Sequence, residues 1–342
     1  MSNRLANRDL TVVVMMLFSL AVPAAITLKT ISERSPLVYK PETPSISPFG
    51  YSLSLLLFGV PSVVIAMWFL FSQRYDIERR SFFRTFFVGF AFGCLLDGFF
   101  GTTFLEFRNL RATLGLNLPA FTPGQGFGLK IPVEEFLFYA LGFITILLVY
   151  IWSDVYWFSA YHADELSREA KAIPRLIRLH WNSAFITAAL ILAAVAYKHL
   201  GPHAYHEGFP GYFTFLVLAG ALPAMLFFPN VKLYINWRAL SLTLFVILFI
   251  SLLWEVTLGV PYAWWGYRDT QMMGLFIEAW AHLPIEAVFV WIAAVWGTVI
   301  TYEVFRIRLH MDRSLVGALL GESLNGEKGF LEANESHSQH TF

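Results

Sequence analysis

The stretch PVEEFLFYALGFITILLVYIW (residues 132–152) is a membrane-length apolar run that begins with a proline and two glutamates. A second run, PIEAVFVWIAAVWGTVITYEV (residues 284–304), begins with a proline and one glutamate. A transmembrane helix needs roughly 20 apolar residues, so each run is long enough to cross a membrane. Ionisable side chains at membrane depth are costly, so a carboxylate signature at the start of two such runs indicates a functional site.

The composition of the chain places these runs in a membrane protein. Hydrophobic residues make up 57% of the 342 residues and charged residues only 14%, and the mean hydropathy is +0.58. These values do not fit a soluble domain. A net charge of +0 and the lack of a basic block exclude nucleic acid as a partner. The single cysteine, Cys94, excludes an internal disulfide and a cysteine-based metal cage.

Apolar runs of membrane-spanning length occur eight times, which predicts an all-α, multi-pass protein of the cell membrane. They cover residues 10–29, 50–72, 83–101, 132–152, 181–200, 209–229, 236–258 and 284–304. A cleaved signal peptide is the alternative interpretation of the first run, because Arg4 and Arg8 precede it and an alanine-containing stretch lies near its end. We prefer a retained helix, because the repeat described below needs it as a partner.

A polar segment between the fourth and fifth runs divides the chain into two halves. We predict a first four-helix repeat (residues 1–153), a cytoplasmic linker (154–180), a second four-helix repeat (181–312) and a disordered tail (313–342). The linker suits an interfacial amphipathic helix or a plain cytoplasmic loop. Twice as many Lys and Arg residues fall on the side of the two termini as on the other side, which predicts cytoplasmic termini.

The two halves share a spaced pattern of acids, glycines and aromatics. Asp97 and Glu255 each end an apolar run upstream of a Pro-x-Glu signature, and a glycine follows each acid by four residues. An aromatic residue, Phe107 or Trp265, follows each acid by ten residues. An even number of spans per half makes this a parallel repeat, so both signatures are expected to face the same side of the membrane.

This pattern resembles that of the integral-membrane lycopene cyclases of bacteria, archaea and fungi. The residues that carry the resemblance are Trp254-Glu255, Gly259, Trp264-Trp265-Gly266, Pro284-Ile285-Glu286 and Tyr302-Glu303, with Asp97 and Pro132 to Tyr139 in the first half. The chain departs from the family pattern at Ala287, where a second carboxylate is usual, and at Leu96, Glu106 and Phe107, where aromatics or tryptophans are usual. The resemblance implies acid-catalysed, non-redox cyclisation of the ends of lycopene or a related polyene.

Five carboxylates are the predicted catalytic residues: Asp97, Glu134, Glu135, Glu255 and Glu286. Asp97 and Glu255 lie near the carboxyl ends of their runs, where the helix dipole and low dielectric disfavour the ionised form and suit a proton donor. The three glutamates at helix amino ends would suit cation stabilisation and proton removal. The alternative is structural, since proline and an acid are both favoured in the first turn of any helix.

Five aromatic residues are predicted to line a polyene slot: Phe107, Phe138, Trp264, Trp265 and Tyr267. Their π faces could stabilise a carbocation. The alternative for Trp and Tyr near the ends of spans is a belt at the membrane interface.

Other functional classes remain open at this point. A proton-coupled transporter could also place carboxylates between two repeats, and a different polyene-modifying membrane enzyme would share the apolar substrate. No metal or other cofactor is predicted, because His199, His203 and His206 lie in a loop without a second cluster and no nucleotide-binding glycine motif occurs. The expected partners are a lipophilic polyene and membrane lipid, with a homo-oligomer or association with other carotenoid enzymes left open.

Overall fold

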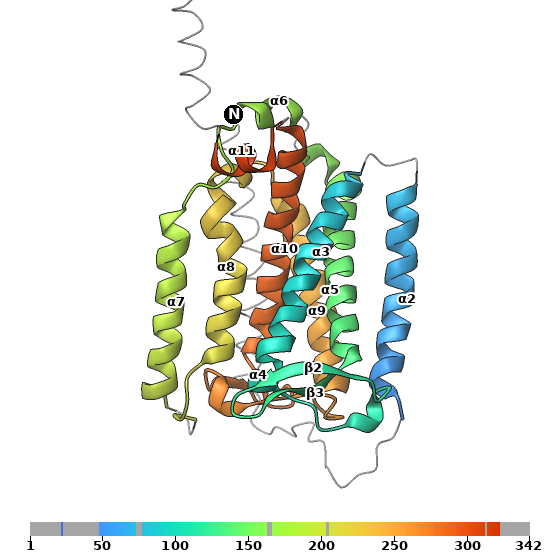
Figure 1. The fold of residues 1–342 in the computed structure, drawn as a ribbon, viewed down its shortest axis with the longest axis vertical. Helices are drawn as coiled ribbons and strands as arrows, with labels where there is room; N and C mark the ends of the chain where they lie inside the picture. The colour runs from blue at the N-terminus through green and yellow to red at the C-terminus, as the bar shows by residue number, and fades with distance from the viewer. Residues whose placement is uncertain are drawn as a thin grey trace, which may run out of the picture.

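A computed structural model describes residue 22 and residues 48–72, 77–162, 166–202, 205–311 and 313–321. Within these ranges, seven helices are long and apolar enough to cross a membrane (Figure 1). They are α2 (Gly50–Phe71), α3 (Arg79–Leu96), α5 (Val133–Trp152), α7 (Trp181–Leu200), α8 (Gly211–Val231), α9 (Trp237–Trp254) and α10 (Glu286–His310). The prediction of a mostly helical, multi-pass membrane protein is confirmed. The run at residues 10–29 falls outside the described residues apart from Val22, so the eighth span and the parallel repeat stay predictions.

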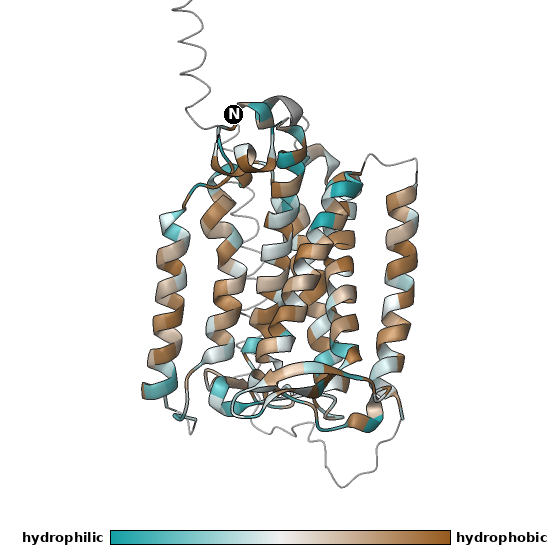
Figure 2. Ribbon diagram, in the orientation of Figure 1, coloured by the Kyte–Doolittle hydropathy of each residue, from teal (hydrophilic) through white to brown (hydrophobic). Residues whose placement is uncertain are grey.

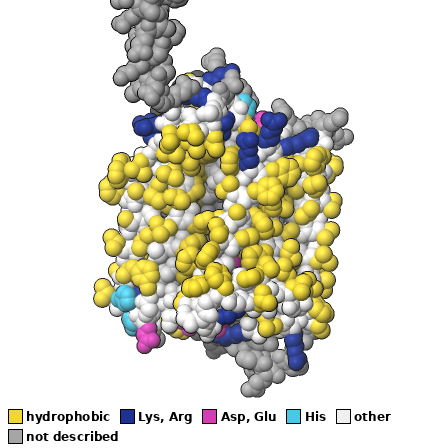
Figure 3. Space-filling view, viewed as in Figure 1, with side chains coloured by type: hydrophobic (Ala, Val, Ile, Leu, Met, Phe, Trp, Pro, Cys, Tyr) yellow, Lys and Arg dark blue, Asp and Glu magenta, His cyan; other side chains and the backbone are white. Residues whose placement is uncertain are grey.

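The sides of the bundle carry apolar side chains, as a surface in contact with lipid requires. Large apolar side chains are exposed on the two outermost helices, such as Leu57 and Val64 of α2 and Phe185 and Leu192 of α7. In a soluble protein such side chains would mostly be buried in the core. Hydrophobic residues run along the helices in Figure 2, and they cover the sides of the molecule in Figure 3. The helices are therefore apolar on both their inner and outer faces.

Helix α10 lies in the middle of the bundle and packs against α3, α5, α8 and α9, while α2 and α7 lie at opposite edges (Figure 1). Its contact with α8 depends on Gly220, because a Cβ at that position would lie 2.9 Å from the Cα of Ala293. Van der Waals packing of this kind is the main attraction between helices in lipid, where neighbouring acyl chains are as apolar as leucine. The close approach of α8 and α10 helps to position the amino-terminal ends of both helices.

Three short antiparallel strand pairs close one end of the bundle, where the sequence predicted only loops. β1 (Leu105–Glu106) pairs with β4 (Gly266–Tyr267), β2 (Asn117–Thr122) with β3 (Gly126–Pro132), and β5 (Phe276–Ile277) with β6 (Leu283–Pro284). A turn in which Gly124 and Gly126 have positive φ angles of 78° and 72° joins β2 to β3. The β1–β4 pair links the two predicted halves, because Leu105 lies opposite Tyr267.

The predicted linker and the start of the predicted tail pack together at the other end. After α5 the chain forms a π-helical turn (Ser153–Trp157) and, further on, the short helix α6 (Leu166–Ala172). The expectation of a disordered tail from residue 313 is wrong for its first part, because Leu315–Leu320 form helix α11. The backbone N–H of Leu176 donates to the carbonyl of Ala318 at 2.8 Å. The polar composition of the tail had concealed this short apolar segment.

Lys and Arg side chains gather at the end of the bundle that carries α6 and α11, on the face shown in Figure 3. This agrees with the charge distribution used to predict that side as cytoplasmic. The orientation in the membrane stays a prediction.

Candidate functional site

The two upstream acids lie in the same local structure. Asp97 begins a π-helical turn, Asp97–Gly101, at the end of α3, and Glu255 begins another, Glu255–Gly259, at the end of α9. Both carboxylates are buried. Single π-helical turns frequently occur at functional sites. The matched spacing from acid to glycine in the sequence thus corresponds to a matched backbone conformation.

The three downstream glutamates occupy the first turns of α5 and α10, and all are buried. Oε1 of Glu134 accepts hydrogen bonds from Ser52 Oγ at 2.5 Å and from the N–H of Leu114 at 2.7 Å. Oε1 of Glu286 accepts one from the N–H of Met273 at 2.5 Å. These bonds hold helix α2 and two loop segments against the helix starts, so Glu134 and Glu286 have a structural role here.

Each of the other three acids accepts a hydrogen bond from a tyrosine hydroxyl. Tyr139 donates to Asp97 Oδ1 at 3.0 Å, Tyr51 donates to Glu135 Oε1 at 2.7 Å, and Tyr267 donates to Glu255 Oε1. Burial, and after it the nearby Glu255 charge, raise the pKa of the Tyr267 phenol, so this phenol keeps its proton and remains a donor. Sequence reasoning missed Tyr51 and Tyr139, because a single tyrosine within an apolar run carries no distinctive pattern.

Glu135 and Glu255 face the same small cavity. Its volume is about 40 Å³, and both carboxylates belong to its lining together with aromatic side chains of α5, α8, α9 and α10. Asp97 lies behind this wall and is hydrogen-bonded to the lining residue Tyr139. Glu134 and Glu286 are not part of the lining. We call this space the acid cavity.

Two apolar cavities adjoin the acid cavity on either side of Phe138 and Trp291, which line all three spaces. The larger cavity, of about 260 Å³, lies among α3, α5, α8 and α10. The smaller, of about 60 Å³, lies among α2, α5, α9 and α10. The rings of Phe138 and Trp291 meet edge to face, with centroids 5.4 Å apart. Two carboxylates therefore face a cavity that shares its walls with two apolar cavities.

The aromatic residues predicted to bind substrate occupy different positions around the acid cavity. Trp265, Tyr267 and Phe138 line the acid cavity. Trp264 lies one layer further out and stacks on Tyr51 with ring centroids 5.4 Å apart. Phe107 packs against the same aromatic group and is not part of the cavity lining. Both tryptophans are buried, a position that does not fit an interfacial belt.

Trp265 is held close to Glu255 by the absence of a side chain at Gly259. The indole Nε1 donates to Glu255 Oε1 at 3.3 Å, and a Cβ at Gly259 would lie 2.4 Å from two atoms of the indole ring. Gly259→Ala is expected to displace the indole and to lower the free energy of unfolding by about 1–3 kcal/mol through overpacking. Tryptophan fluorescence and thermal unfolding in detergent micelles measure the two effects.

Gly98→Ala is the matched control for this substitution. Gly98 lies in the other π-helical turn, and a Cβ there would meet nothing within 4 Å. Because alanine favours helix over glycine, no loss of stability is expected at this position. An equal loss for both variants would contradict the argument from the indole ring.

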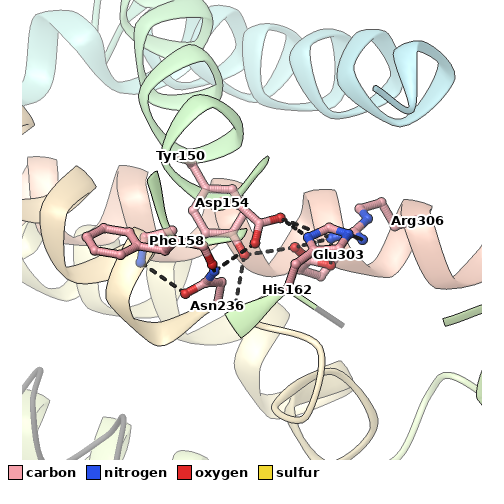
Figure 4. A network of polar contacts seen from close by, with 8 residues as sticks. Tyr150, Asp154, Phe158, His162, Asn236, Glu303 and Arg306 are labelled. Atoms are coloured by element: carbon pink, nitrogen blue, oxygen red, sulfur yellow. Dashed lines mark hydrogen bonds and ion pairs between the residues drawn. The ribbon is translucent and has the colours of Figure 1, made fainter. Parts of the chain in front are cut away.

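A second buried polar cluster lies at the α6 end of the bundle, far from the acid cavity along the helices (Figure 4). Arg306 donates to both carboxylate oxygens of Glu303, at 3.0 and 3.1 Å, and forms an ion pair with Asp154 at 3.6 Å. Tyr150 donates to Glu303 at 2.8 Å. The hydrogen bond with Asp154 raises the pKa of His162, so this ring keeps its proton to a higher pH than a free histidine. Each charge here has a partner, which indicates a structural role.

Comparison of the chain with protein-family models, with curated proteins and with solved structures found no match. Among the described residues, no group of three or more His, Cys, Asp or Glu side chains could hold a metal ion. The fold and the site define a polytopic membrane protein with two carboxylates that face one cavity beside two apolar cavities.

Proposed function

We propose that this protein is a membrane enzyme of carotenoid biosynthesis, an intramolecular lyase or isomerase that cyclises the linear end groups of lycopene or a related polyene. The observation that supports it most is the position of Glu135 and Glu255, which face one cavity between two apolar cavities. An acid and a base that face the same cavity meet the requirements of proton-initiated ring closure.

The reaction would begin when the Glu255 carboxyl donates its proton to the terminal double bond of the polyene. The resulting tertiary carbocation is attacked by the π electrons of an internal double bond, which forms the carbon–carbon bond of the ring. The Glu135 carboxylate then removes a proton next to the new cation, and a ring double bond forms. Hydrogens and electrons balance within the substrate, so the reaction needs no redox cofactor.

The surroundings of the cavity suit a cationic intermediate. The faces of Phe138, Trp254 and Trp265 border the acid cavity and can stabilise positive charge through their π electrons. Tyr51 holds Glu135 in place by its hydrogen bond. Filling of the acid cavity by the substrate would exclude water and so protect the carbocation from hydration. In this scheme Glu134 and Glu286 anchor the loops around the cavity, and Asp97 holds Tyr139 in its wall.

A proton-coupled transporter is the other class that such carboxylates allow. Transporter sites typically lie at discontinuous helices near the membrane midplane. Here the five acids lie at one end of the bundle, in the π-helical turns that follow α3 and α9 and in the first turns of α5 and α10. This position favours an enzyme whose substrate enters from the lipid.

Expression in a host that accumulates lycopene tests the proposal. We expect cyclic carotenoids in extracts of cells that carry the protein and only lycopene in cells with an empty vector. Chromatography and mass spectrometry distinguish the two pigments. Unchanged lycopene, with the folded protein present in the membrane, would contradict the proposal.

A further inference from the structure

Four tyrosines line the acid cavity, and one of them differs from the rest. They are Tyr51, Tyr139, Tyr212 and Tyr267. Three of these hydroxyls donate to a carboxylate. Tyr51 donates to Glu135, Tyr139 to Asp97 and Tyr267 to Glu255. The hydroxyl of Tyr212 makes no hydrogen bond to any residue within the described ranges, although the side chain is only 6% exposed. Its oxygen is not among the fully buried side-chain atoms that lack a partner, so the hydroxyl opens onto the space of the cavity.

Tyr212 occupies a central position among the acids. It is the second residue of α8, and its ring packs 5.2 Å from that of Phe104 and 6.3 Å from that of Tyr267, measured between centroids. Tyr212 shares the lining of the acid cavity with Glu135 of the first predicted half and Glu255 of the second. Each of the other three cavity tyrosines donates to one carboxylate, whereas the Tyr212 hydroxyl is bound to neither half.

The proposed reaction leaves the acids in the wrong protonation states for another turnover. After one ring has formed, Glu255 has lost its proton and Glu135 has gained one. The surroundings are apolar, so exchange with bulk water is slow and the proton needs a route from Glu135 back to Glu255. A phenol can accept a proton on its oxygen while it donates its own, which makes it suitable for such a transfer.

We propose that Tyr212 is a further catalytic residue, the proton relay that resets the site between turnovers. The Glu135 carboxyl donates its proton to the Tyr212 oxygen while the Tyr212 O–H proton passes to the Glu255 carboxylate. Glu135 is again a base, Glu255 is again an acid, and the phenol is unchanged. This inference rests on the proposed cyclisation, and it adds a step that follows ring closure.

Tyr212→Phe tests the relay, because it keeps the ring and removes only the hydroxyl. The purified protein in detergent micelles is mixed with excess lycopene, and rings are counted per enzyme over time. We expect a burst of one ring per enzyme at the wild-type rate, followed by turnover that is slower by roughly a hundredfold. Wild-type enzyme is expected to show no such change of rate after the first ring.

Tyr302→Phe is the matched control. Tyr302 is also a buried tyrosine, but it lies on α10 beside Arg306, at the far end of the bundle. This variant is expected to cyclise lycopene like the wild type in all phases. It shows whether loss of a buried phenol hydroxyl by itself changes the kinetics.

The remaining outcomes separate the relay from the proposed function. Wild-type kinetics for Tyr212→Phe would overturn the relay and leave cyclisation intact. A first ring that forms as slowly as the later ones would also overturn the relay, since Tyr212 would then act before or during ring closure. If the wild-type protein forms no ring, the proposed function is wrong and the relay falls with it.

Discussion

Glu255→Gln is expected to lower the rate of ring formation by roughly a thousandfold, the range typical for loss of a general acid. The amide has nearly the same shape as the carboxyl, and its oxygen can still accept from Tyr267 and Trp265 as Glu255 does. The fold should therefore survive. The amide cannot donate a proton to an alkene, so the reaction stops before the carbocation forms. Pigment chromatography in the lycopene-accumulating host measures the loss.

Glu278→Gln is the matched control, because it makes the same chemical change at a carboxylate that is 49% exposed and paired with His282. It is expected to leave ring formation unchanged. Glu286→Gln provides a further comparison of the rate of ring formation. Glu286 lies outside the acid cavity, and its carboxylate accepts from the backbone N–H of Met273. Activity of Glu255→Gln close to the wild-type level would exclude Glu255 as the proton donor.

Arg306→Met is expected to destabilise the protein by about 3–5 kcal/mol, the largest stability change among these predictions. Removal of the guanidinium leaves the buried carboxylate of Glu303 without a positive partner and leaves Asp154 paired with His162 alone (Figure 4). The methionine side chain is of similar length, so the effect comes from charge and hydrogen bonding more than from lost volume. The free energy of unfolding in mixed micelles measures it.

Arg108→Met serves as the control for the loss of an arginine. Arg108 forms its ion pair with Glu106 at the surface and is 67% exposed, so its removal should cost less than about 1 kcal/mol. Adding Glu303→Gln to Arg306→Met is expected to restore part of the stability, because a neutral amide can still accept from Tyr150. No recovery in the double variant would show that the uncompensated Glu303 charge is not the cause.

Much of the helical framework could be predicted from the sequence. The run predicted at residues 181–200 is helix α7, and the runs at 50–72 and 236–258 differ from α2 and from the α9 span by a residue at their ends. Membrane spans are predictable because each needs about 20 apolar residues, whatever its neighbours are. The strand pairs were missed because β2 and β3 contain Pro119 and several glycines, which favour loops in a sequence pattern.

In the site, too, some features of single residues could be predicted from the sequence and others could not. The sequence by itself determined which carboxylates would lie at the ends of apolar runs, because an acid within such a run is rare and costly. Only the tertiary structure decided that Glu135 and Glu255 share a cavity, while Glu286 is turned toward a loop backbone. Tyr51 of α2 and Tyr139 of α5 donate to the acids, and Tyr212 of α8 lines the same cavity. Such contacts depend on how helices pack, and helix packing is not encoded in the periodicity of any one segment.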